Sequence, residues 1–516
     1  MLILISCGLF FVTSLTLIGL RILRPEARYT WLVAMGGAML GFVSVFLWLV
    51  QLPLNLELPG VPTLDAFNSS LVFSADGISF PLALCIAALT LSILLTAVTQ
   101  PVYVNTLVWA GTLALGGAGI LAVTSNNPLT LLLMWAALDL TEIIIHLRSV
   151  SGESNNEKVV ISFSTRALGI GFLLWGSMVS IADANTFEFQ SMSARAGIFL
   201  VIAAGLRLGV LPLHLPYASE SNLRRGFGTA VRLISSASSL ILLGRIPVGI
   251  LSSNLTPFLM ILTLIAALYG GWTWLRAPDE LNGRPHWVIG IASLAILSAL
   301  SGNPVGAVAW GCALILVGGA LFLASAQNIW LNRIMLIGAF SISALPFSLT
   351  ASAWLGGLGF FIPFVILAQA LMMAGFVRHA LRPANRDSLD EQPGWMQAVY
   401  PAGIILLILI QVMLGLIGWE GASQFGAWLQ ASIASFLTFG LVWASRRFRI
   451  FNPVRAHWVS STESRLGSLY QGIWSIYRLL GRMSQIVIQT LEGEGGIMWT
   501  LLFLVLFVSL LTQVGP

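Results

Sequence analysis

Long apolar runs follow one another along almost the whole chain, with short polar stretches between them. Each run is long enough to cross about 30 Å of hydrocarbon as a helix. We count sixteen such segments, at 2–20, 30–51, 80–99, 103–123, 127–146, 159–182, 196–216, 226–246, 256–275, 286–301, 304–326, 328–350, 354–377, 397–418, 424–445 and 496–514. The pattern predicts an all-α, polytopic membrane protein with no separate soluble domain.

Composition and charge fit this prediction. Of the 516 residues, 57% are hydrophobic and 9% are charged. Loops after odd-numbered segments, together with the C-terminal amphipathic stretch, hold nineteen of the twenty-five Lys and Arg residues, whereas loops after even-numbered segments hold two, Arg195 and Arg245. Basic loops stay in the cytoplasm, so we expect the N-terminus outside and a first segment that is retained rather than cleaved. The net charge of +5 then indicates topology and contact with anionic lipid, and no nucleic-acid partner.

Ionisable side chains inside the apolar segments are the main functional candidates. Arg207 lies in the middle of segment 196–216, shortly before Pro212 and Pro216. Proline removes a backbone donor and interrupts a helix. A buried cation beside such a break indicates either an ion pathway or a structural ion pair, and both readings stay open.

The carboxylates inside the predicted segments are Asp139 and Glu142, both in segment 127–146. A buried carboxylate without a partner is costly, so each should be paired or protonated. For Glu142 the sequence favours a position at headgroup level near the helix end. In segment 159–182 we expect Arg166 to bond to neighbouring helices, and Arg232 adds a further cation in segment 226–246.

The stretch around Arg207 resembles a motif of the antiporter-like membrane subunits shared by respiratory complex I, membrane-bound hydrogenases and Mrp-type cation–proton antiporters. That motif is close to K-S-A-Q-F-P-F-H-x-W-L-P-D-A-M-E-A-P. Pro212, His214 and Pro216 fall in register with it, while the family lysine is Arg207 and the family aspartate is Tyr217. Three further stretches resemble family motifs, at 76–79, 165–169 and 344–348.

The resemblance implies two inverted five-helix repeats, with broken helices seven and twelve at Pro212 and Pro346. The implied division has N-terminal helices at 1–123, a first repeat at 124–250 and a second repeat at 251–380. Helices fourteen and fifteen follow at 381–454, and a lateral amphipathic helix with the last span at 455–516. We expect the lateral helix, roughly Ser461 to Leu491, to lie along the membrane surface. The implied location is the cell inner (plasma) membrane or an equivalent energy-transducing membrane.

The residues that the family uses to move protons are mostly replaced. The glutamate beside Trp135 is Ala136, and Asp139 stands one turn further along the same face. The other family histidines and lysines fall on Ala230, Ser236, Gly319, Leu323 and Ala353. Arginine keeps the charge of a lysine but does not release a proton. Gly318 and Gly319 further suggest helix contact where the family has a wet path.

Three functions remain open at this point. The first is an antiporter-like subunit of a complex I-like assembly, degenerate in proton pumping and kept for structure or coupling. The second is an active proton or cation path that uses Asp139, Arg207, Arg232 and water. The third is an unrelated secondary transporter with its cavity at the broken helices. The partners implied by the resemblance are other membrane subunits, and the ions are protons or sodium.

No motif points to a cofactor, a metal or a catalytic residue. The sequence has no phosphate loop, haem ligand set, iron–sulfur cysteine cluster or zinc motif. Cys7, Cys85 and Cys312 are isolated within apolar segments and fit small core residues. If the chain is part of a membrane oxidoreductase, we expect it to carry no redox chemistry of its own.

Overall fold

In the computed structural model, each predicted segment from 2–20 to 424–445 contains helix. The structure describes residues 1–24, 29–58, 70–99, 106–149, 153–184, 188–213, 225–246, 254–326, 328–382, 388–418, 426 and 428–448. Its α-helices are α1 Leu2–Leu23, α2 Thr30–Phe46, α3 Ser79–Thr96, α4 Thr106–Thr124, α5 Pro128–Ser149, α6 Glu153–Ala184, α7 Ala194–Leu208, α8 Arg225–Gly244, α9 Thr256–Arg276, α10 Arg284–Leu300, α11 Pro304–Leu323, α12 Ile329–Met335, α13 Ile337–Ser341, α14 Ile362–Ala380, α15 Gly394–Met413 and α16 Trp428–Phe448.

Short 3-10 turns extend several of these helices. They lie at Leu47–Val50, Ala97–Thr99, Phe189–Ser191, Gly359–Phe361 and Leu389–Glu391, and a π-helical turn follows α15 at Leu414–Gly418. Ten helices of the described part are long and apolar enough to cross a membrane. The prediction of an all-α, multi-pass membrane protein is therefore confirmed. The lateral helix and the last predicted span lie outside the described residues.

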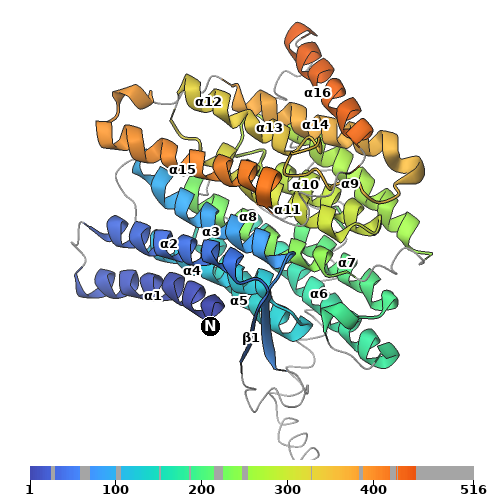
Figure 1. Ribbon diagram of the computed structural model, residues 1–516, viewed down its shortest axis with the longest axis horizontal. Helices are drawn as coiled ribbons and strands as arrows, with labels where there is room; N and C mark the ends of the chain where they lie inside the picture. Colours follow the sequence, from blue (N-terminus) through green and yellow to red (C-terminus); the bar gives the residue numbers. More distant parts are fainter. Residues whose placement is uncertain are drawn as a thin grey trace, which may run out of the picture. The chain divides into compact units, whose positions relative to one another are not determined.

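The core of the unit Met1–Pro453 lies at α3, α8 and α11. In these three helices, 83%, 94% and 94% of the most apolar window is buried, compared with 33% in α1. Figure 1 shows the three lying among the other helices, with α1 at one edge and α16 at the other. Helices buried on all sides tend to be apolar all round, and α3 and α11 have near-continuous hydrophobic sequences. Helix α8 is also buried but carries Arg232 and a run of serines. All three cysteines are buried, Cys85 in α3, Cys312 in α11 and Cys7 in α1.

Two helices end before the prolines that the sequence singled out. After α7, Gly209 adopts a positive φ of 74°, and the amides of Val210 and Leu211 both donate to the carbonyl of Gly205, at 2.8 and 3.1 Å. This is a glycine C-cap, and it places Pro212 in the turn that follows. His214 and Pro216 lie outside the described residues.

The second interruption follows α13, and residues 342–358 around Pro346 are not helical. Irregular backbone is tolerated at membrane depth only when protein satisfies it. Here Gln369 donates to the carbonyl of Ile342 at 3.1 Å, and Asn303 donates to the carbonyl of Ser352 at 2.7 Å. Side chains of α14 and of the α11 N-cap thus hold the non-helical stretch.

A small two-stranded sheet was not predicted from the sequence. Strand β1 Leu54–Leu58 pairs antiparallel with β2 Leu71–Ala75, with Leu54 opposite Ala75. In Figure 1 the hairpin projects away from the ends of the nearby helices. The second strand leads directly into Asp76, whose carboxylate accepts the backbone amides of Ile78 and Ser79 at the start of α3. The hairpin therefore positions the N-terminus of a core helix.

Candidate functional site

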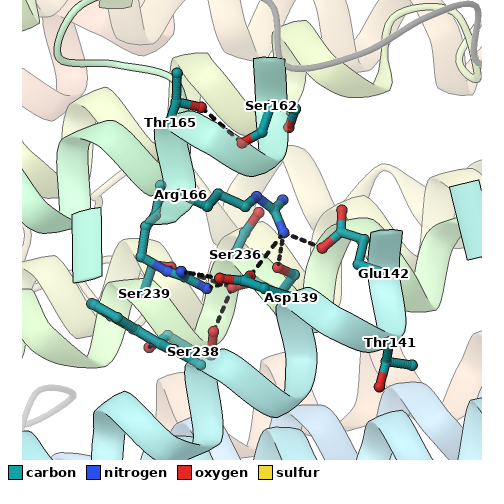
Figure 2. A network of polar contacts seen from close by, with 12 residues as sticks. Asp139, Thr141, Glu142, Ser162, Thr165, Arg166, Ser236, Ser238 and Ser239 are labelled. Carbon is teal, nitrogen blue, oxygen red and sulfur yellow. Dashed lines mark hydrogen bonds and ion pairs between the residues drawn. The ribbon is translucent and has the colours of Figure 1, made fainter. Parts of the chain in front are cut away.

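A cluster of charged side chains lies where α5, α6, α7 and α8 meet. Asp139 and Glu142 come from α5, Arg166 from α6 and Arg207 from α7, and each is at most 7% exposed. Residues three apart on a helix share one face, so both carboxylates of α5 can meet the arginines of its neighbours. Figure 2 shows Asp139, Glu142 and Arg166 pointing toward one another. We call these four residues the charge quartet.

Arg207 binds Asp139 with both prongs of its guanidinium group. Nη1 is 2.5 Å from Oδ2 and Nη2 is 2.8 Å from Oδ1, while Nε donates to Ser239 Oγ at 3.2 Å. The guanidinium carbon lies 4.2 Å from the ring centre of Trp135, one turn before Asp139 on α5. Trp135 is itself fixed because its indole donates to the carbonyl of Ser238 at 2.9 Å. Two-pronged pairing and ring stacking are both arrangements that arginine favours over lysine.

Arg166 joins the second carboxylate to the first. Its Nη1 forms an ion pair with Glu142, lies 3.4 Å from Asp139 Oδ1 and donates to Ser235 Oγ at 2.9 Å. Asp139 is therefore shared by two arginines, and Glu142 is bound to one of them. With all four groups ionised, the two positive and two negative charges cancel. Neutralisation by hydrogen-bonded partners is what makes buried charges tolerable in a membrane interior.

Glu142 is enclosed by protein. Its side chain is 5% exposed and paired with Arg166. Helix α5 continues to Ser149, so Glu142 is almost two turns from the helix end. The Glu142 side chain faces α6. The sequence of α5 alone does not reveal which side of α5 is covered by α6.

Arg232 of α8 is also buried, with 3% of its surface exposed. It lies about one turn before Ser235 and Ser236, and Ser236 Oγ donates to its backbone carbonyl at 2.8 Å. The serines of α8 thus line the quartet from one side. The sequence reasoning missed Ser235 and Ser239 as ligands of the arginines, although their run in 235–239 of an apolar helix was a visible signal.

A small pocket borders the quartet between α5 and α6. Its lining is Asp139, Glu142, Ile143, Val159, Ser162, Phe163 and Arg166. The room for the centre of a water molecule is about 10 Å³. A cavity needs roughly 10–15 Å³ by this measure to hold one water. The pocket therefore has space for about one water against two carboxylates and a guanidinium group.

Gly319, Leu323 and Ala353, on which the resemblance places family histidines and lysines, are tightly packed. A Cβ atom on Gly318 would lie 2.4 Å from Trp287 Nε1, and one on Gly319 would lie 2.8 Å from a methyl group of Leu89. Leu323 is 1% exposed and Ala353 is fully buried. In this part of the described structure, these positions are occupied by close helix contact.

A separate ion pair lies at the other end of α8. Asp76 Oδ2 binds Arg245 Nη1 at 2.5 Å, and Asp76 Oδ1 also accepts the hydroxyl of Ser79 at 2.9 Å. Burial raises the pKa of Asp76, but the charge of Arg245 and the hydrogen bonds from Ser79 outweigh it. The pKa of Asp76 is therefore below its ordinary value of 3.8. This pair ties the N-terminus of α3 to the C-terminus of α8.

Comparison with known proteins gives the class of the fold. No protein-family model matches the chain. NADH-ubiquinone oxidoreductase chain 2 of Polypterus ornatipinnis is 28% identical over 210 residues, which are 36% of this chain and 56% of that protein. The match thus spans little more than half of the relative's length.

Solved structures match over much more of the chain. A chain of the Mrp complex from a Dietzia species superposes with a TM-score of 0.67 at 12% identity, over 95% of this chain and 63% of that one. A chain of the membrane-bound sulfane sulfur reductase, an archaeal respiratory membrane complex, gives 0.64 at 12% identity, over 98% and 100%. A chain of respiratory complex I from Thermus thermophilus gives 0.59 at 16% identity, over 80% and 98%.

These likenesses confirm the resemblance named from the sequence. The fold is the one found in chains of Mrp and complex I assemblies, and the described helices reproduce it. At 12–16% identity the solved structures establish the fold alone.

Proposed function

We propose that this chain is an antiporter-like membrane subunit of a complex I-like, ion-translocating assembly, and that it is degenerate in proton pumping. Its contribution is to structure or to coupling between neighbouring subunits. Support comes from the fold and from the sequence match to a chain of NADH-ubiquinone oxidoreductase. The proposed partners are the other membrane subunits of that assembly and lipid, in an energy-transducing membrane with the N-terminus outside.

The observation that carries the proposal is the two-pronged pair between Arg207 and Asp139. A residue that relays protons must gain and lose one, and arginine does not do so in proteins. Its guanidinium group is held by a carboxylate, a serine hydroxyl and an aromatic ring. Such a pair has the features of a fixed structural link between α5 and α7.

The packing of α11 supports the same proposal. Proton transfer along the membrane mid-plane needs titratable groups joined by water. Gly318 and Gly319 instead allow Trp287 and Leu89 to pack directly against α11. The proposal includes the family's two inverted repeats, with divisions at residues 124, 251, 381 and 455. The close packing of α11 would modify that organisation.

One observation favours the alternative, an active proton or cation path through relocated charges. The water-sized pocket touches Asp139, Glu142 and Arg166. Water there would give the carboxylates a proton donor, with Arg207 and Arg232 as fixed charges further along. In this alternative Asp139 or Glu142 would exchange protons during turnover.

Reconstitution separates the two functions. The purified full chain is placed in liposomes with a pH-sensitive dye inside, and proton and sodium gradients are imposed in turn. The degenerate subunit should give the same flux as empty liposomes. Flux above that background, abolished by Asp139→Asn but not by Asp183→Asn at the partly exposed end of α6, would establish the alternative.

A further inference from the structure

Three arginines gather at the adjoining ends of α9 and α14. Arg378 donates to the backbone carbonyl of Leu275, which directly precedes Arg276, so the C-terminal ends of the two helices lie side by side. Arg382 follows Arg378 by one helical turn. The positive charges of Arg276 and Arg382 both repel that of Arg378. The cluster therefore favours an anion beside it.

The nearby acidic side chains are engaged elsewhere. Glu280 is 4% exposed and binds Arg225 at 2.9 Å. Asp279 accepts the backbone and side-chain amides of Asn282 at 2.8 and 2.6 Å. Within the described residues, Nε of Arg276 is buried and has no hydrogen-bond partner. Asn282 is neutral, so Asp279 keeps its negative charge, and the three arginines still outnumber it.

The cluster lies at the end of an exposed apolar stripe. Phe258, Ile261, Ile265 and Trp272 of α9 are 57%, 46%, 54% and 43% exposed. At about 100° per residue, these positions and Arg276 fall along one side of the helix. The guanidinium carbon of Arg276 lies 5.3 Å from the ring centre of Trp272. Tryptophan and arginine side by side are typical of the membrane–water boundary.

We propose that Arg276, Arg378 and Arg382 form a binding site for the phosphate headgroup of an anionic phospholipid. The stripe of α9 would hold an acyl chain, and the arginines would hold the headgroup where that stripe ends. The apolar stripe is the reason to assign a lipid: an inorganic phosphate or an acidic peptide would need no such surface leading to the cations. The inference goes beyond the proposed function and holds whether or not the chain conducts ions.

The test measures lipid retention by native mass spectrometry of the full chain, released from micelles containing equal dioleoyl phosphatidylglycerol and dioleoyl phosphatidylcholine. The wild type should retain phosphatidylglycerol selectively. Arg276→Gln with Arg382→Gln should reduce that selectivity by roughly 30-fold, since each surface arginine contributes about one kcal/mol to anionic lipid binding. Arg195→Gln, which removes an exposed arginine on α7, should leave it unchanged.

Two further variants keep the test decisive. Arg276→Lys with Arg382→Lys should retain most of the selectivity. Arg382→Gln alone changes a single exposed residue, so this variant should fold normally. Unchanged selectivity in the double glutamine variant would overturn the proposal. So would full displacement of the lipid by inorganic phosphate at equal concentration. Loss of a copurifying acidic protein with lipid retention unchanged would overturn it as well, and would make the surface a protein interface.

Discussion

Arg207 stacks on the ring of Trp135, with the guanidinium carbon 4.2 Å from the ring centre. The same helix supplies Asp139 one turn further on, and this carboxylate takes both terminal nitrogens of the arginine. One face of α5 thus provides a flat surface and a two-pronged acceptor for a single cation of α7. The arrangement matches the shape of arginine rather than that of lysine.

Arg207→Lys should therefore destabilise the protein although the charge is kept. An ammonium group cannot pair with both carboxylate oxygens in the same plane, and it stacks less well on the indole. We expect a loss of roughly 1–3 kcal/mol in the free energy of unfolding, measured by denaturant titration in detergent. Arg195→Lys, in the same helix with its side chain 80% exposed, is the matched control and should change little. Equal effects of the two substitutions would argue against the geometry.

The two carboxylates of the quartet should differ in importance. Asp139 contacts both Arg207 and Arg166, whereas Glu142 pairs with Arg166. Breaking a buried ion pair by removing one partner costs about 3–5 kcal/mol. Asp139→Asn should approach that range and lower the yield of folded protein, and Glu142→Gln should cost less. A larger loss for Glu142→Gln than for Asp139→Asn would contradict this order.

Gly318→Ala tests the close packing of Trp287 against α11. The added methyl group would lie 2.4 Å from Trp287 Nε1, so the indole must move. Overpacking of this kind typically costs 1–3 kcal/mol. Gly171→Ala, in α6 with no atom within 4 Å of the new Cβ, should be neutral or slightly stabilising. Thermal unfolding midpoints of the two variants provide the comparison, and a neutral Gly318→Ala would contradict close packing.

The pair between Asp76 and Arg245 should make stability depend on acid pH. Because the folded-state pKa of Asp76 is below its ordinary value of 3.8, the native state favours the ionised carboxylate. This contribution is fully present above the ordinary pKa, and it is lost as pH falls through the lowered folded-state pKa. Unfolding midpoints measured between pH 6 and about pH 3 should therefore fall less steeply in Asp76→Asn than in wild type. Identical slopes would show that this pair does not contribute.

Much of the fold could be predicted because hydropathy directly records contact with lipid or with a helical core. The apolar runs and the end of α7 before Pro212 follow from local chemistry, whereas the interruption at Pro346 was expected from the family resemblance. The predicted span 328–350 contains two short helices that end at Ser341. The hairpin of β1 and β2 was not predicted, although β1 alternates apolar and polar residues as a half-buried strand does. Strand β2 lacks that alternation, and the two short strands pair across a gap of twelve residues.

The candidate site was predictable in part. Asp139 and Arg207 stood out because a charge in an apolar helix needs a partner, and the structure brings them together. The contact of Glu142 with Arg166 depends on how α6 packs against α5, which a single sequence does not report. The role of Ser235 and Ser239 was missed for the same reason, since serine is common in membrane helices without being a ligand.

The most direct test of the central claim is ion pumping by the native assembly that carries Asp139→Asn together with Arg207→Gln. The double change removes one negative and one positive charge and leaves the pair of Arg166 with Glu142 in place. Proton translocation is measured in inside-out membrane vesicles after the subunits of the complex have been quantified. We predict an assembled complex whose pumping is nearly that of wild type, with much of the stability lost in Asp139→Asn recovered. A fully assembled complex with pumping abolished would contradict the account and establish a proton path through the quartet.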